Sequence, residues 1–131
     1  MTDPRIRCDR TAAWPLLTAH YEQTGRGFNV REAFAADGER FSRFSQQAPL
    51  VFADLSKNLI DQRVRELLTQ LATECGVEAY RDAMFAGEPI NNTENRAVMH
   101  WLLRTPANYQ SSNAFIAQSH KDVHETLDAM L

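Results

Sequence analysis

The sequence predicts a mainly α-helical fold with one small β-hairpin at about residues 41–55. Three observations support this class. Apolar residues recur at helical spacing through most of the chain, and capping residues or glycines stand at the ends of these repeats. Only two runs resemble strands, and a short connection containing Ala48-Pro49 separates them. The chain has 131 residues, so we expect a single domain over residues 1–131.

Two helices are expected before the hairpin. The first spans about residues 11–24 and places three apolar side chains on one face, namely Trp14, Leu17 and Tyr21. The second begins after Asn29, whose side chain can accept hydrogen bonds from the first turn, and Glu32 follows three residues later as in a capping box. We expect Phe34 to anchor this short helix, which should end near Ala36.

The predicted hairpin joins residues 41–46 to residues 50–55. Its second run, Leu50-Val51-Phe52-Ala53-Asp54-Leu55, is nearly continuously apolar, which predicts burial on both faces. A two-stranded hairpin alone is marginally stable in water, so helices or further strands should cover it.

The clearest helix begins at Asp61 and follows the i, i+3, i+4, i+7 apolar pattern as far as Cys75. Gly76 is the residue expected to end it in a left-handed conformation. A second helix should then run from about Val77 to Gly87.

Two helices are expected in the last third of the chain. Thr93 should cap a helix over Glu94–Leu103, which Thr105-Pro106 stops. After a polar loop at residues 107–113, a final helix is expected to start near Asp122. It ends on its apolar face at Met130-Leu131, as a truncated helix would.

Composition narrows the function classes. Fourteen basic and seventeen acidic residues give a net charge of −3, and the charges are scattered, which argues against nucleic-acid binding. The N-terminal stretch has no apolar core typical of a signal peptide, and no window approaches membrane-spanning length. We therefore expect a cytoplasmic protein without a membrane partner. Cys8 and Cys75 lack metal-ligand or redox spacing, so both should be free thiols.

Three side chains near the C-terminus have the spacing of one helix face, namely His120, His124 and Asp128. Histidine with carboxylate suits zinc or another transition metal. However, no general-base glutamate stands between the histidines, and three side chains on one exposed face rarely complete a coordination shell. We therefore expect a solvated polar face and no metal.

A second candidate is the basic set Arg96, His100 and Arg104, which could bind phosphate near a helix N-terminus. No glycine-rich cradle accompanies these residues, so we favour a structural interpretation in which Arg96 and His100 pair with acidic residues of neighbouring helices. Lys57 follows the apolar strand and is equally consistent with a binding residue or a loop lysine. No nucleophile with a matching base is evident.

Longer motifs point to a family. Met84-Phe85-Ala86-Gly87-Glu88 and Ile90-Asn91-Asn92-Thr93-Glu94-Asn95-Arg96-Ala97-Val98-Met99-His100 resemble the N-terminal region of the glucose-6-phosphate isomerase family. Further matches follow in the same order as in the family, namely Phe41-Ser42-Arg43-Phe44-Ser45, Asp54-Leu55-Ser56-Lys57-Asn58-Leu59-Ile60 and Gly76-Val77-Glu78-Ala79. Two positions depart from the family pattern, at Asn92 and at His120.

The resemblance implies an α+β, mainly helical N-terminal segment of a larger sugar-isomerase α/β enzyme. That enzyme interconverts glucose 6-phosphate and fructose 6-phosphate in glycolysis and gluconeogenesis, through an enediol and with a glutamate base. It is cytoplasmic, usually a homodimer, and uses no metal or organic cofactor. The phosphate loop and base motif belong to later domains and are not found in these 131 residues. We therefore assign no catalytic, cofactor-binding or metal-binding residue here.

We accordingly expect the isolated chain to be inactive and to pack, in the parent enzyme, against the remaining domains while helping to shape the dimer. Sugar phosphate should bind only to the full-length enzyme. One alternative is a free-standing helical interaction module that has lost catalysis, which a natural stop codon after Leu131 would support. Another is a small helical metal protein, which depends on His120, His124 and Asp128.

Overall fold

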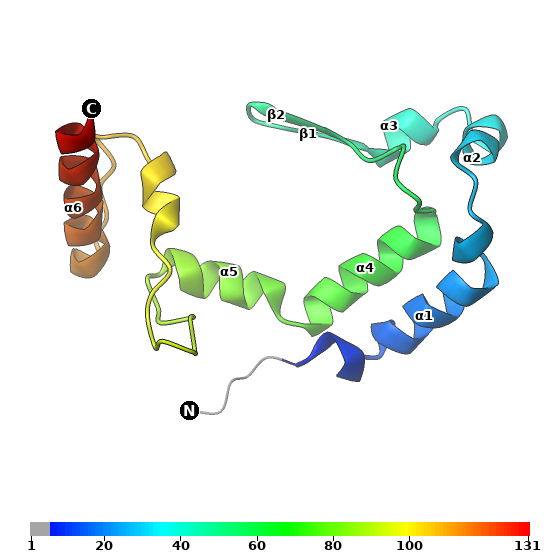
Figure 1. Cartoon of the computed structure of the whole chain (residues 1–131), viewed down its shortest axis with the longest axis horizontal. Helices are drawn as coiled ribbons and strands as arrows, with labels where there is room; N and C mark the ends of the chain where they lie inside the picture. The colour runs from blue at the N-terminus through cyan, green and yellow to red at the C-terminus, as the bar shows by residue number, and fades with distance from the viewer. Residues whose placement is uncertain (1–5) are drawn as a thin grey trace. The chain divides into compact units, whose positions relative to one another are not determined.

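The computed structural model describes residues 6–131, and Figure 1 shows their helices and the hairpin. Residues 1–5, the start of the stretch without a signal-peptide core, lie outside this range. Contacts between residues divide the described chain into two compact units, residues 6–75 and residues 76–131. The predicted class, mainly helical with a small hairpin, is confirmed.

The unit of residues 6–75 contains four α-helices, two short 3-10 turns and the hairpin. Its elements are the 3-10 turn Cys8–Arg10, α1 (Ala13–Gln23), the 3-10 turn Gly25–Gly27, α2 (Val30–Ala36), α3 (Arg40–Phe44), β1 (Ser45–Ala48), β2 (Val51–Asp54) and α4 (Gln62–Glu74).

Local capping residues set three of these boundaries as the sequence predicts. The Asn29 side chain accepts from the backbone N–H groups of Arg31 and Glu32, and it donates to the Glu32 carboxylate at 3.1 Å. Asp61 accepts from the N–H of Val64 at 2.8 Å and so caps α4. Beyond α4, Gly76 has φ +73°, the left-handed conformation that glycine adopts at little cost.

Helices α1 and α4 lie side by side (Figure 1) and are tied at both ends. At one end the Glu74 carboxylate accepts from the N–H of Ala13 at 3.0 Å, which caps α1 because Ala12 has no capping side chain. At the other end His20 Nε2 lies 2.8 Å from the Asp61 carboxylate. The side chains of Ala13, at the first tie, and of Leu67 are completely buried.

The hairpin is confirmed, but its strands are shorter and more exposed than predicted. Residues 41–44 of the expected first strand belong to α3 (Arg40–Phe44), and β1 pairs with β2 only from Ser45 opposite Asp54 to Ala48 opposite Val51. In the helical turn the Arg43 N–H bonds to Glu39 O, and the Arg40 guanidinium lies 4.6 Å above the Phe44 ring. The expected burial of the second strand is also wrong, because Val51 and Phe52 are more than half exposed.

The unit of residues 76–131 contains α5 (Val77–Phe85), the 3-10 helix His100–Arg104 and α6 (Ala114–Met130). A series of ring contacts links these elements. Phe85–Trp101 and Trp101–Tyr109 are edge-to-face with centroid separations of 5.2 and 6.0 Å, and Tyr109–His120 is tilted at 5.5 Å. Leu102 and Ile116 are its buried aliphatic side chains. The packing of this unit therefore depends strongly on aromatic contacts.

The prediction of a helix over Glu94–Leu103 is wrong. Asn91 and Arg96 instead exchange two backbone hydrogen bonds of 3.0 and 3.1 Å around a turn in which Asn95 has φ +51°. The Asn91 side chain, rather than Thr93, caps this turn by accepting from the N–H groups of Thr93 and Glu94. Only a 3-10 helix follows, and it ends at Arg104 before Thr105-Pro106 as expected.

The last helix begins eight residues earlier than expected. The loop at residues 107–113 is confirmed, but the Asn113 side chain accepts from the N–H groups of Phe115 and Ile116 and so caps α6 there. The early start places Ile116 and His120 in the buried part of the unit.

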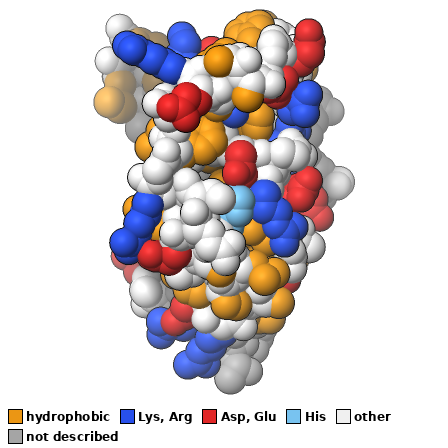
Figure 2. All heavy atoms as spheres, turned by 90° about the vertical axis from the view of Figure 1, so that its right-hand side faces the viewer, with side chains coloured by type: hydrophobic (Ala, Val, Ile, Leu, Met, Phe, Trp, Pro, Cys, Tyr) orange, Lys and Arg blue, Asp and Glu red, His pale blue; other side chains and the backbone are white. Residues whose placement is uncertain are grey.

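Charge is dispersed over the face that Figure 2 shows. Figure 2 views the molecule from the α1 and α2 side, where acidic and basic side chains alternate with apolar ones instead of forming one basic field. Among residues 6–131, no helix combines the length and the apolar composition needed to cross a membrane.

Candidate functional site

Two of the three candidate metal ligands, His120 and His124, lie in contact, but the three side chains do not form one cluster. His120 and His124 have ring centroids 4.3 Å apart on α6, and His120 Nε2 lies 3.2 Å from Pro106 O. Asp128 is exposed, and no cluster of three metal-ligating side chains occurs within residues 6–131. The expected solvated face is wrong for His120, which is only 7% exposed and packs against Tyr109. This arrangement is that of a packed aromatic interior.

The basic set Arg96, His100 and Arg104 is only partly brought together: Arg96 and His100 line one groove within residues 76–131, and Arg104 is not among its lining residues. Arg96 lies in the bridge turn and pairs at 3.3 Å with Glu94, two residues away and also exposed. This pairing corrects the expectation of a partner on a neighbouring helix. His100 and Arg104 are exposed on the 3-10 helix, and the α-helix N-terminus that would have bound an anion is not formed.

The stretch from Asp54 to Ile60 is the most elaborately hydrogen-bonded loop in residues 6–75. Ser56 is completely buried, and both its hydroxyl and its N–H donate to the Asp54 carboxylate, at 2.5 and 2.9 Å. These two hydrogen bonds, the hydroxyl first, lower the pKa of Asp54. Lys57 is exposed on the same loop. The geometry is that of a loop fixed in place, with its lysine directed to solvent.

Arg40 organises this loop, and the sequence analysis missed it. Its guanidinium donates from Nε to Ser56 O at 2.8 Å, and from one terminal nitrogen to Asn58 O and Ile60 O at 3.0 and 2.8 Å. Three rings surround the cation, with centroids 4.6 Å away for Phe44, 5.4 Å for Phe28 and 5.7 Å for Phe34. Only 3% of Arg40 is exposed.

No sequence signal singles out Arg40, because its partners come from several elements. The only hint is an arginine within an aromatic-rich stretch from Phe28 to Phe44. With its donors directed at backbone carbonyls and its faces covered by rings, Arg40 is a structural cation.

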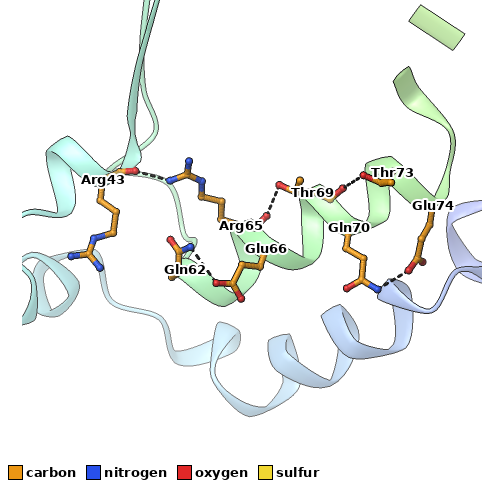
Figure 3. Close-up of a pocket in the computed structure, with 8 residues that line it drawn as sticks. All are labelled: Arg43, Gln62, Arg65, Glu66, Thr69, Gln70, Thr73 and Glu74. Carbon is orange, nitrogen blue, oxygen red and sulfur yellow. Dashed lines mark hydrogen bonds between the residues drawn. The ribbon is translucent and has the colours of Figure 1, made fainter. Parts of the chain in front are cut away.

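An open polar groove runs along α4, and Figure 3 shows its lining. Its side chains bond chiefly to one another or to nearby backbone. Arg65 donates to Arg43 O at 2.7 Å, Gln62 to Glu66 at 3.2 Å, and Gln70 to Glu74 at 2.6 Å. Hydrogen bonds from the Ala13 N–H and then from Gln70 lower the pKa of Glu74, which keeps it a carboxylate. The groove therefore offers few unengaged polar groups for a sugar or phosphate.

A second, more apolar groove lies within residues 76–131. It is bounded by the segment 96–103 and by α6, and its apolar lining includes Val98, Met99, Leu103, Val123 and Leu127. Its polar lining includes Glu94, Arg96, His100 and Asp122, and Glu94 pairs with Arg96 at 3.3 Å.

The polar side chains described above serve mainly as helix caps and as ties between neighbouring segments. Cys8 is exposed, Cys75 is partly buried, and both are free thiols as expected. The Asp61 carboxylate caps α4 and contacts His20. Burial raises its pKa, but the hydrogen bonds from the Val64 N–H and the His20 ring lower it by a larger amount, so the pKa of Asp61 is lowered overall. Its role is again structural.

The family model described as phosphoglucose isomerase matches residues 54–130. A glucose-6-phosphate isomerase of Albidiferax ferrireducens is 57% identical over 130 residues, covering 95% of this chain and 25% of that protein. One of Polaromonas naphthalenivorans is 57% identical over 132 residues, covering 97% and 25%. One of Leptothrix cholodnii is 55% identical over 125 residues, covering 95% and 22%.

The chain spans about a quarter of the length of these curated relatives. The matched residues include the loop that Arg40 fixes, the bridge turn at residues 91–96, and the whole of α5 and α6. Of these segments, the loop, the bridge turn and α5 carry motifs that indicated the family from the sequence. The match to the family model, together with relatives 57% identical over almost the entire chain, shows that this protein belongs to the phosphoglucose isomerase family.

Proposed function

We propose that this chain is the N-terminal part of a glucose-6-phosphate isomerase and that it contributes packing surface rather than chemistry. The observation that carries the proposal is the 57% identity to named isomerases over 95% of this chain but only 25% of their length. In the whole enzyme the reaction would be the interconversion of glucose 6-phosphate and fructose 6-phosphate, with sugar phosphate bound only when the other domains are present.

Catalytic inactivity of the isolated chain is supported by its polar groups. The carboxylates that are held ionised, those of Asp54, Asp61 and Glu74, serve a loop serine and two helix termini. A general base must instead reach a substrate proton directly or through one water. The glutamate base and phosphate loop that the family resemblance implies have no counterpart in this sequence.

The structural role is supported by exposed apolar surface in both units. The hairpin leaves Val51 and Phe52 more than half exposed, and α6 leaves Met130 78% exposed. Covering such surface is favourable by roughly 25 cal/mol per Å². We propose that the remaining domains of the same polypeptide cover both units, that the 131 residues then act as one N-terminal domain, and that this domain helps shape a cytoplasmic homodimer.

The test compares three purified proteins in a coupled assay of fructose 6-phosphate formation. They are the 131-residue chain, the Polaromonas naphthalenivorans relative, and a chimera in which this chain replaces the matching 132 residues of that relative. We expect no turnover from the chain alone and turnover within tenfold of the relative from the chimera. Turnover by the chain alone would refute its inactivity. A folded but inactive chimera would refute its role in the isomerase and favour the free-standing interaction module.

A further inference from the structure

The tip of the β1–β2 hairpin has an unusual residue. Ala48 pairs with Val51, so Pro49 and Leu50 form a two-residue turn, and Leu50 has φ +64°. Proline followed by a residue of positive φ is the pattern of a type II turn, in which glycine or asparagine is preferred at the second position. A side chain with a β-carbon is disfavoured there by roughly 1–2 kcal/mol. Leucine at this position is therefore conformationally unfavourable in the isolated hairpin.

The leucine also gains nothing from packing within its own unit. Leu50 is 105% exposed, so no side chain among residues 6–75 covers it. Figure 1 shows the hairpin extending from α3 away from α1 and α4. A strained and fully exposed leucine is explained if its side chain is buried by something outside this unit.

The apolar surface continues from the tip toward α3. Val51 is 59%, Phe52 54% and Phe41 52% exposed, and the rings of Phe41 and Phe52 lie 6.1 Å apart. We call these three residues and Leu50 the hairpin surface; it spans both faces of the hairpin, because Val51 and Phe52 are consecutive in β2 and point to opposite faces. On the partner strand, residues 46 and 47 are uncharged glutamines. A surface of this composition fits an apolar partner.

We propose that the hairpin surface docks on the remaining three quarters of the isomerase polypeptide, with Leu50 as the anchoring side chain. The relatives supply the length argument, because this chain covers only 25% of them. The size of the hairpin surface supplies a second argument. Two half-exposed phenylalanines, a valine and a leucine offer on the order of 500 Å², whereas a stable dimer needs about 800 Å² per partner.

A surface of that size suffices for stable docking when both partners belong to one polypeptide, because covalent linkage removes most of the entropic cost of association. The proposal rests on the proposed function, since it takes the rest of the isomerase as its occupant.

The test measures hydrogen exchange of the backbone amides of residues 45–54 in the 131-residue chain and in the chimera. We expect exchange at least tenfold slower in the chimera, because docking protects the hairpin. Two replacements remove the anchor without backbone strain, Leu50→Gly and Leu50→Asn, since both residues tolerate positive φ. In the chimera they should accelerate exchange several-fold, whereas in the isolated chain they should leave it unchanged or slow it.

The matched control is Leu59→Asn, which alters another exposed leucine, 66% exposed, away from the hairpin. It should leave exchange of residues 45–54 unchanged in both proteins. Equal exchange in the chain and the chimera, or slower exchange with Leu50→Gly in both, would overturn the proposal.

Concentration-dependent protection in the isolated chain that Leu50→Asn abolishes would also overturn it, by identifying a second copy as the occupant. An inactive chimera whose hairpin is nevertheless protected would count against the proposed function and not against the docking.

Discussion

Replacement of Arg40 by methionine tests the organisation of residues 6–75. Methionine fills much of the same space but removes all the donors that bind Ser56 O, Asn58 O and Ile60 O. It also removes the cation from among the three phenylalanine rings. The loop that joins β2 to α4 should then lose its main attachment to α3.

The magnitude follows from the burial of each acceptor. Ser56 is completely buried, so leaving its carbonyl unpaired costs about 1–3 kcal/mol. Asn58 is exposed and Ile60 partly exposed, so water can replace the guanidinium at their carbonyls. The loss of each of these two hydrogen bonds should cost about 0.5–1.5 kcal/mol of stability. Removing a buried charge offsets part of the total, since its desolvation penalty disappears. We expect a net loss of about 3 kcal/mol in the free energy of unfolding.

Urea unfolding of the 131-residue chain, followed by circular dichroism, measures this loss. With a slope of about 2 kcal/mol per molar urea, the midpoint should fall by about 1.5 M. Arg40→Lys keeps the charge but cannot reach all three carbonyls, so its midpoint should lie between those of the wild type and Arg40→Met. Amide exchange of residues 56–60 should accelerate in both variants.

The control is Arg26→Met. Arg26 also lies over an aromatic ring, 5.9 Å from the centroid of Tyr21, and pairs with Glu22 at 2.9 Å, but its side chain is 66% exposed. Its replacement should change the unfolding free energy by less than about 0.5 kcal/mol. If Arg40→Met were no more destabilising than Arg26→Met, the buried cation would not be what fixes the loop.

Three further replacements test other contacts. Glu74→Gln should lower the urea midpoint at pH 7, because the carboxylate that accepts from the Ala13 N–H has a lowered pKa. Its stabilisation is present above the ordinary pKa of glutamate and is lost as pH falls through the lowered pKa, so the difference from wild type should shrink between pH 6 and pH 3. Gly87→Ala should destabilise residues 76–131 by about 1–2 kcal/mol in thermal unfolding, because φ is +74° and the new Cβ would lie 3.1 Å from Ile116 Cγ1. Asn29→Ala should cost about 1 kcal/mol by removing the cap of α2, measured by urea unfolding.

Each replacement has a matched control. Glu78→Gln changes an exposed glutamate in the first turn of α5 and should show less pH dependence than Glu74→Gln. At Gly38, a Cβ would meet no atom within 4 Å, so Gly38→Ala should be close to neutral. Asn29→Asp keeps an accepting oxygen and should retain the cap. If Gly87→Ala matched Gly38→Ala, or Asn29→Asp matched Asn29→Ala, the corresponding contact would not contribute as described.

Sequence reasoning succeeded where neighbouring residues decide the structure. Asn29, Asp61 and Gly76 act within a few residues of their own positions, so their capping roles could be predicted from side-chain chemistry and φ preference alone. The motif around Ile90–His100 indicated the family, because an ordered series of matches is specific even when the local conformation is not.

Prediction from sequence failed where competing or distant contacts decide the structure. Thr93 has the chemistry of a cap, but the Asn91 side chain accepts from its N–H, and the backbone bridge to Arg96 closes a turn in place of a helix. Arg40 could not be identified because its carbonyl partners lie 16 to 20 residues away, and no local pattern encodes them. The sequence also marked β2 as buried on both faces, a signal that docking of the hairpin on further polypeptide would explain.

Isomerase turnover is the measurement that tests most directly whether these residues contribute surface and not chemistry. The 131-residue chain and its chimera with the Polaromonas naphthalenivorans isomerase should be assayed side by side at equal concentration. We predict no turnover above buffer for the chain and turnover within tenfold of the parent relative for the chimera. Turnover by the chain alone, or a folded chimera without activity, would contradict this account.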